Sequence, residues 1–237
     1  MTEHTHKQFD ADMEAIRSGV LSMGGIVETQ LARAIELLER EQESSALLDA
    51  VGADEQVINQ MQVDMDQQCS MIIAKRQPAA IDLRMILTVT KIVNDLERTG
   101  DEIKKIARRA ADTTQYQRLS QVRHFDVSRA AARARETLQL ALDSFARLDV
   151  NAAAEVIDLD DEIDAAFSAI MRQLISYMME DPRTITPALE IIFMAKAIER
   201  IGDHAKNMAE QVIYIVKGTD VRHVDPANIE RELAGTE

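Results

Sequence analysis

The chain has 237 residues, of which 46% are apolar and 3% aromatic, and 41 acidic against 27 basic residues give a net charge of −14. This charge disfavours binding to nucleic acids and to anionic membrane surfaces, which are themselves negative. The only cysteine, Cys69, excludes an internal disulfide. Residues 1–12 contain no apolar signal segment, and the purest apolar run, residues 191–195, is far shorter than the about 20 residues that span a bilayer. We expect a cytoplasmic protein with no membrane insertion and no nucleic-acid partner.

Few glycines and prolines interrupt the sequence, and the long segments between them have helical periodicity. The third segment shows an apolar stripe with spacings of three and four: Ile86, Val89, Val93, Leu96, Gly100, Ile103 and Ala107. Its opposite face carries Lys104, Lys105, Arg108 and Arg109. We therefore predict an all-α protein with six long helices at about 8–42, 46–76, 80–112, 120–148, 152–180 and 185–216.

An internal repeat relates the two halves of the chain. The sequence Glu-Arg-x-Gly-Asp at residues 97–101 returns 102 positions later at residues 199–203, and Lys104 returns as Lys206. Three predicted helices precede or contain each copy. We expect two pseudo-repeated three-helix bundles, at residues 7–115 and 117–218, followed by a polar C-terminal tail at 219–237.

Each copy of the repeat places two carboxylates four residues apart, at Glu97 and Asp101 and at Glu199 and Asp203. On a helix both side chains of such a pair project from one face, at the border of the apolar stripe. The glycine within each copy costs a helix about 1 kcal/mol relative to alanine. We expect a close approach to the backbone there, by a neighbouring helix or by a bound ion cluster.

A second acidic pair, Asp160 and Asp164, lies on the preceding predicted helix, and the first half has Glu55 and Asn59 at the corresponding place. Carboxylates that converge without cations repel each other, and a divalent or trivalent metal ion neutralises them. Hard oxygen ligands suit Mg, Mn, Ca or Fe better than a thiolate-type zinc site.

Ordinary surface ion pairs are the alternative interpretation, because Arg98 or Arg200 can reach Glu102 or the nearby aspartate. His204 adjoins Asp203, but it lies off the carboxylate face and is a weak candidate ligand. The Glu-x-x-His pairs of a ferritin-type di-iron centre are missing from the repeat. The sequence has no phosphate-binding glycine loop, zinc helix or nucleophile beside a histidine, so we do not expect an enzyme.

The chain resembles the PhoU family of bacterial phosphate-signalling regulators over nearly its full length. The resemblance rests on residues 23–25 (Met-Gly-Gly), 76–78 (Arg-Gln-Pro), 82–84 (Asp-Leu-Arg), both Glu-Arg-x-Gly-Asp copies, 177–181 (Tyr-Met-Met-Glu-Asp) and 216–218 (Val-Lys-Gly). It implies two three-helix bundles and a metal site on each, with Mg, Mn, Fe or Zn as the metal. The implied ligands are Glu97, Asp101 and Glu55 in the first site, and Glu199, Asp203, Asn207, Asp160 and Asp164 in the second.

The first site departs from the family pattern at Asn59 and Lys105. We expect the amine of Lys105, one turn beyond Asp101, to compete with a metal ion there.

The same resemblance implies the function. The protein would be a negative regulator of phosphate uptake and of the phosphate-starvation response, acting between the phosphate ABC transporter ATPase and a sensor histidine kinase. We expect a homodimer that reaches the inner membrane only through these partners. Two alternatives remain open from the residues alone: a metal-dependent enzyme or metal store, and a purely structural helical dimer.

Overall fold

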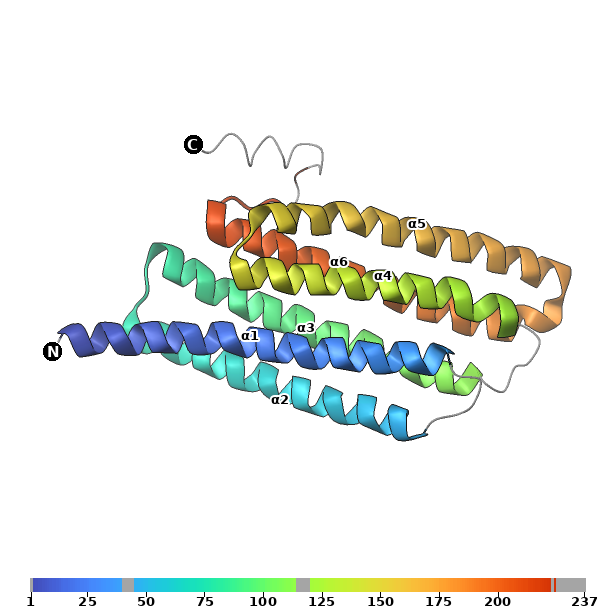
Figure 1. Cartoon of the computed structure of the whole chain (residues 1–237), viewed down its shortest axis with the longest axis horizontal. Coiled ribbons are helices and arrows are strands. Elements are labelled where there is room, and N and C mark those ends of the chain that lie inside the picture. The colour runs from blue at the N-terminus through green and yellow to red at the C-terminus, as the bar shows by residue number, and fades with distance from the viewer. Residues whose placement is uncertain (1, 40–44, 114–119, 223, 225–237) are drawn as a thin grey trace.

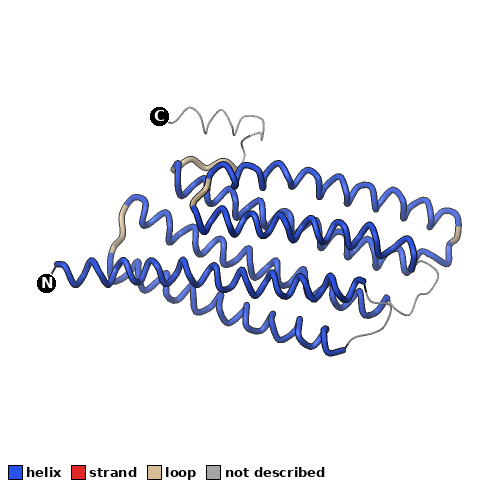
Figure 2. The backbone as a smooth tube through the Cα atoms, in the orientation of Figure 1, coloured by secondary structure: helices blue, strands red, loops and turns tan. Residues whose placement is uncertain are grey.

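The computed structural model describes residues 2–39, 45–113, 120–222 and 224. Six long helices account for nearly all of them, and no strand occurs in these ranges (Figure 1; Figure 2). The helices are α1 (Thr2–Glu39), α2 (Ser45–Arg76), α3 (Ala80–Thr113), α4 (Ser120–Arg147), α5 (Val150–Glu180) and α6 (Ile185–Lys217), with a short 3-10 turn η2 (Pro182–Thr184) before α6. The all-α prediction is confirmed. The main difference is at the start of α1, which begins six residues before the predicted position.

Turn and capping residues set the ends of these helices. The segment between α2 and α3 contains Pro78, and Gln77 and Ala80 on either side adopt positive φ angles of 50° and 48°. The Asp149 carboxylate caps α5 by accepting hydrogen bonds from two backbone N–H groups, at 3.0 and 3.1 Å. Gly218 ends α6 in the left-handed conformation, with its N–H donating to the Tyr214 carbonyl at 3.0 Å.

The helices form two three-helix bundles, α1–α3 and α4–α6, which lie side by side along their length (Figure 1). The pairs α3 with α6 and α1 with α4 join the bundles. Between α1 and α4 the approach is close, because a Cβ atom on Gly24 would lie only 2.5 Å from a methyl carbon of Leu142. Helices α3 and α6 run antiparallel, since Arg109 near the end of α3 contacts Glu190 near the start of α6.

Small and aliphatic side chains fill the core, as the composition predicted. All seven residues of the apolar stripe in α3 are buried. Cys69 is 1% exposed, and burial raises the pKa of its thiol to about 11. Hydrophobic burial of this kind stabilises the bundles by about 25 cal/mol for each Å² of apolar surface removed from water.

The two repeat glycines lie where a neighbouring helix packs closely against the helix backbone. A Cβ atom on Gly100 would lie 3.2 Å from a methyl carbon of Ile58 on α2. One on Gly202 would lie 2.9 Å from the equivalent carbon of Ile163 on α5 and 3.2 Å from Asp160 Oδ1. A neighbouring helix therefore accounts for the close approach that the sequence predicted. The shared geometry also shows that α2 and α5 occupy equivalent places in the two bundles.

The first residues after α6 pack against the bundle. Val221 is buried, and Arg222 pairs with Asp220 at 2.5 Å. The part of the predicted polar tail at residues 225–237 lies outside the described residues. No helix in the described ranges is both long and apolar enough to cross a membrane.

Candidate functional site: two carboxylate clusters

The second bundle brings four of the predicted carboxylates together between α5 and α6. We call this group, Asp160 and Asp164 with Glu199 and Asp203, the second cluster. The pKa of Asp203 is raised by the loss of water around its carboxyl group and then by the charges of Glu199, Asp160 and Asp164. The pKa of Asp164 is raised by the same kinds of cause, with Asp160 as its strongest charged neighbour. All four groups therefore act on one another across the helix pair.

Two lysines offset part of this negative charge. Lys206 Nζ lies 2.8 Å from Asp160 Oδ2, and Lys196 Nζ lies 2.5 Å from Glu199 Oε1. The other oxygen of each pair, Asp160 Oδ1 and Glu199 Oε2, is buried and has no hydrogen-bond partner among the described residues. Buried carboxylate oxygens without a partner cost free energy, and both are oriented as acceptors that a cation can satisfy.

The first bundle has a smaller group, which we call the first cluster: Glu55 on α2 with Glu97 and Asp101 on α3. The pKa of Glu97 is raised mainly by desolvation, next by the charge of Asp101, and to a smaller extent by the charge of Glu55. Lys104 Nζ lies 2.7 Å from Glu55 Oε2, and Asn59 donates a hydrogen bond to the other oxygen of Glu55 at 3.3 Å. Both oxygens of Glu55 are therefore occupied.

The structure corrects three details of the sequence prediction. Asn207 lines a hollow together with Asp203, but its side chain donates to Asp95 Oδ1 of the other bundle at 3.3 Å. The cation on the first cluster is Lys104, whereas Lys105 pairs with Glu102 at 2.9 Å. Lys104 is consequently not part of a solvent-facing basic stripe. Spacing along one helix gave no information on which neighbouring helix each of these side chains faces.

The side chains of the two clusters are of the chemical type that binds a hard cation, but their positions in this structure are not those of a formed metal site. Every candidate ligand in the two clusters is a carboxylate, which Mg, Mn, Ca and Fe accept. However, no three His, Cys, Asp or Glu side chains of the described ranges stand close enough together to hold a metal ion as they are. Two of the four carboxylates of the second cluster are instead paired with lysines. Binding a metal there requires side-chain rearrangement.

Sequence reasoning missed a buried polar interface between the bundles. Asp95 on α3 lies inside the apolar stripe and contacts His204 Nδ1 on α6 at 3.0 Å. Glu102, also buried, accepts a hydrogen bond from Arg200 at 2.7 Å as well as pairing with Lys105. A charged residue between apolar neighbours, as at Asp95, was the available signal. Arg200 and His204 therefore join the two bundles.

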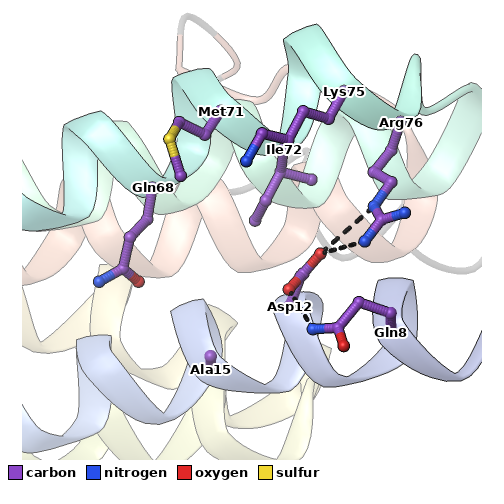
Figure 3. Close-up of a pocket in the computed structure, with 8 residues that line it drawn as sticks. All are labelled: Gln8, Asp12, Ala15, Gln68, Met71, Ile72, Lys75 and Arg76. Atoms are coloured by element: carbon purple, nitrogen blue, oxygen red, sulfur yellow. Dashed lines mark hydrogen bonds and ion pairs between the residues drawn. The ribbon is translucent and has the colours of Figure 1, made fainter.

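A separate groove of about 530 Å³ lies between α1 and the end of α2 (Figure 3). Asp12 is held there by Gln8 at 3.0 Å and by Arg76 at 3.2 Å, and the hydrogen bonds from Gln8 and then from Arg76 lower its pKa. The remaining lining residues are Ala15, Gln68, Met71, Ile72 and Lys75. None of the predicted site residues contributes to the groove. The ion pair fastens the end of α2 to α1.

Fold and clusters together define a class of protein: an all-helical chain made of a duplicated three-helix bundle, with a carboxylate cluster between the last two helices of each copy. The sequence model of the PhoU domain matches residues 20–110 and again residues 127–212, so that each bundle contains one match. The chain belongs to the PhoU family.

Relatives and solved structures agree with this assignment. The phosphate-specific transport system accessory protein PhoU of Escherichia coli K12 is 40% identical, over 99% of this chain and 96% of its own length. The homologue from Pseudomonas aeruginosa is 42% identical, over 98% and 95%. A crystal structure of PhoU from Pseudomonas aeruginosa matches with a TM-score of 0.84 at 43% identity, covering 89% of this chain and all of that one. A regulatory PhoU from Streptococcus pneumoniae shares the fold, with a TM-score of 0.80 at 22% identity.

Proposed function

We propose that this protein is a negative regulator of phosphate uptake and of the phosphate-starvation response. It acts as a non-enzymatic adaptor between a phosphate ABC transporter ATPase and a sensor histidine kinase. The observation that carries the proposal is the full-length similarity to relatives that are named accessory proteins of the phosphate-specific transport system. Such partners would place the protein at the cytoplasmic face of the membrane. We also propose that it forms a homodimer, which light scattering of the purified chain tests.

Deletion of the gene tests the regulatory role. In the deletion strain, alkaline phosphatase expression should stay high even when phosphate is abundant, and a plasmid copy of the wild-type gene should restore repression. Repression that persists in the deletion strain would rule the role out. Capture of the transporter ATPase and the kinase by the purified protein tests the adaptor role separately.

The second part of the proposal is that the carboxylate clusters bind metal ions. In the second cluster Asp160, Asp164, Glu199 and Asp203 would hold a divalent or trivalent ion. A bound ion supplies positive charge that fastens α5 to α6 and removes the mutual repulsion of the carboxylates. The unpartnered buried oxygens of Asp160 and Glu199 support this assignment.

Elemental analysis after dialysis tests metal binding. The wild-type protein should retain metal, and a Glu199→Ala, Asp203→Ala variant should lose the share held by the second cluster. A matched control, Glu155→Ala, Glu162→Ala, removes two exposed carboxylates of α5 outside the cluster and should retain the full amount. A purely structural dimer predicts no retained metal in any of the three. Turnover of oxygen, peroxide or phosphoesters by the metal-loaded protein would instead favour the enzyme alternative.

A further inference from the structure

Lys206 occupies an oxygen that a metal ion in the second cluster would need. Its ammonium group lies 2.8 Å from Asp160 Oδ2, and the Asp160 residue is only 3% exposed. A divalent ion at the same carboxylate would meet this positive charge at a few ångströms, where the repulsion in a partly buried site is strong. The lysine must therefore leave when a metal ion binds, or it must weaken the binding.

A buried acceptor for the displaced lysine lies one helical turn away. Glu210 is on the same face of α6 as Lys206, four residues further on, and is 7% exposed. Among the described residues it makes no hydrogen bond and no ion pair; burial raises its pKa, and the nearby charges of Lys206 and Arg222 oppose this rise. Both side chains line one hollow of about 480 Å³, which Asp203 and Arg222 also line. Lys206 and Glu210 therefore share one hollow and lie one helical turn apart.

We propose that Lys206 is a resident counterion of the second cluster, which a metal ion displaces from Asp160 onto Glu210. This inference rests on the proposed metal-binding function. Without metal, the four carboxylates of the second cluster and the paired Lys196 and Lys206 leave a net charge of −2. The lysine thus stabilises the empty site and sets the affinity for metal, and Glu210 compensates its charge after the exchange.

The first cluster has the same lysine but lacks the acceptor. Lys104, equivalent to Lys206 in the repeat, pairs with Glu55 at 2.7 Å. The residue four positions after Lys104 is Arg108, where the second half has Glu210. A cation there repels a displaced ammonium group, so Lys104 stays on Glu55. The first cluster should therefore bind metal more weakly than the second.

Isothermal titration calorimetry of the metal-free protein with Mn²⁺ tests the exchange. All variants carry E97Q, so that only the second cluster contributes. Lys206→Met keeps the aliphatic stem but removes the charge, and should lower the Kd for Mn²⁺ by about tenfold. Glu210→Gln should raise the Kd by about tenfold in the presence of Lys206, and should have no effect in the Lys206→Met background. Lys75→Met, which removes an exposed lysine far from the cluster, is the control.

The outcomes separate the two proposals. An unchanged or higher Kd in Lys206→Met, or an effect of Glu210→Gln that persists without Lys206, overturns the exchange while metal binding itself stands. Absence of Mn²⁺ binding in the wild type and in every variant overturns the metal-binding function. A gain of affinity provides a second readout. In a chain that carries E199Q to disable the second cluster, Arg108→Glu should strengthen Mn²⁺ binding by the first cluster about tenfold. Circular dichroism of each metal-free variant verifies that it is folded.

Discussion

His204 of α6 lies 3.0 Å from Asp95 of α3, in the interface where the two bundles meet. Asp95 Oδ1 also accepts a hydrogen bond from Asn207 at 3.3 Å, so one carboxylate of the first bundle binds two side chains of the second. His204 and Asn207 follow Asp203 of the second cluster on α6. The bundle interface and the candidate metal site are therefore built on the same turns of α6.

Replacing Asp95 by alanine should weaken the contact between the bundles. The change leaves two polar side chains of α6 without their acceptor in a buried interface, which costs about 1–3 kcal/mol. For a chain of this size that corresponds to a fall in Tm of about 2–4 °C per kcal/mol. Thermal unfolding followed by circular dichroism measures it. Asp143→Ala, an exposed carboxylate on α4, serves as the control, and equal Tm values for the two variants would contradict the buried role of Asp95.

Replacing Gly202 by alanine should push α5 away from α6 at the second cluster. The added carbon would lie 2.9 Å from Ile163 and 3.2 Å from Asp160 Oδ1, so these side chains must move. Overpacking of this kind costs about 1–3 kcal/mol, and displacement of Asp160 should also weaken Mn²⁺ binding.

Gly25→Ala is the matched control for this substitution. Nothing lies within 4 Å of the position of its added carbon, and Gly25 is also in a helix. Replacing Gly25 by alanine should stabilise the protein by up to about 1 kcal/mol. If Gly202→Ala were equally stabilising in urea unfolding, the close approach of α5 to Gly202 would be wrong.

The stability of the metal-free protein should depend on pH through Asp203. Folding raises the pKa of Asp203 above its ordinary value of 3.8. At pH values between the unfolded-state pKa and the folded-state pKa, the native state therefore binds more protons than the unfolded state. The free energy of unfolding therefore falls as the pH rises through this window and stays reduced above it. Asp203→Asn removes the penalty. With a chelator present, this variant should be more stable than the wild type at pH 7. It should be equally stable at a pH well below 3.8, where Asp203 is protonated in both the folded and the unfolded state.

If the second cluster binds metal as proposed, added metal should reverse this order, because the ion would stabilise the ionised cluster only when Asp203 is present. Melting curves at several pH values, with chelator and with Mn²⁺, measure both effects. An Asp203→Asn variant that is less stable than the wild type at neutral pH without metal would show that the carboxylate stabilises the empty site.

Cys69 should not react with thiol reagents while the protein is folded. The thiolate is the reactive form, and burial raises the pKa of this thiol to about 11, with the residue 1% exposed. Labelling with a chromogenic disulfide at pH 8 should therefore proceed at the rate of unfolding and speed up with denaturant. Rapid labelling in buffer alone would contradict the packing of α2 against its bundle.

The sequence by itself determined the helices and the repeat. Apolar spacings of three and four are a local property of a helix, so the stripe from Ile86 to Ala107 identified α3 and its buried face without any knowledge of its neighbours. The 102-residue offset identified the two halves in the same way. Repeat glycines indicated a close approach, because only a constraint from outside the helix explains a glycine at its centre.

Only the tertiary structure decided which groups meet across helices. The sequence already placed Glu55 and Asn59 in correspondence with Asp160 and Asp164, at an offset of 105 residues. The contacts of Gly100 with Ile58 and of Gly202 with Ile163, in contrast, come from the packing of the helices. Packing likewise decides that Asn207 binds Asp95 of the other bundle, and which lysine pairs with each cluster. A side chain on a helix can face either of two neighbours, and the packing of the bundles selects between them.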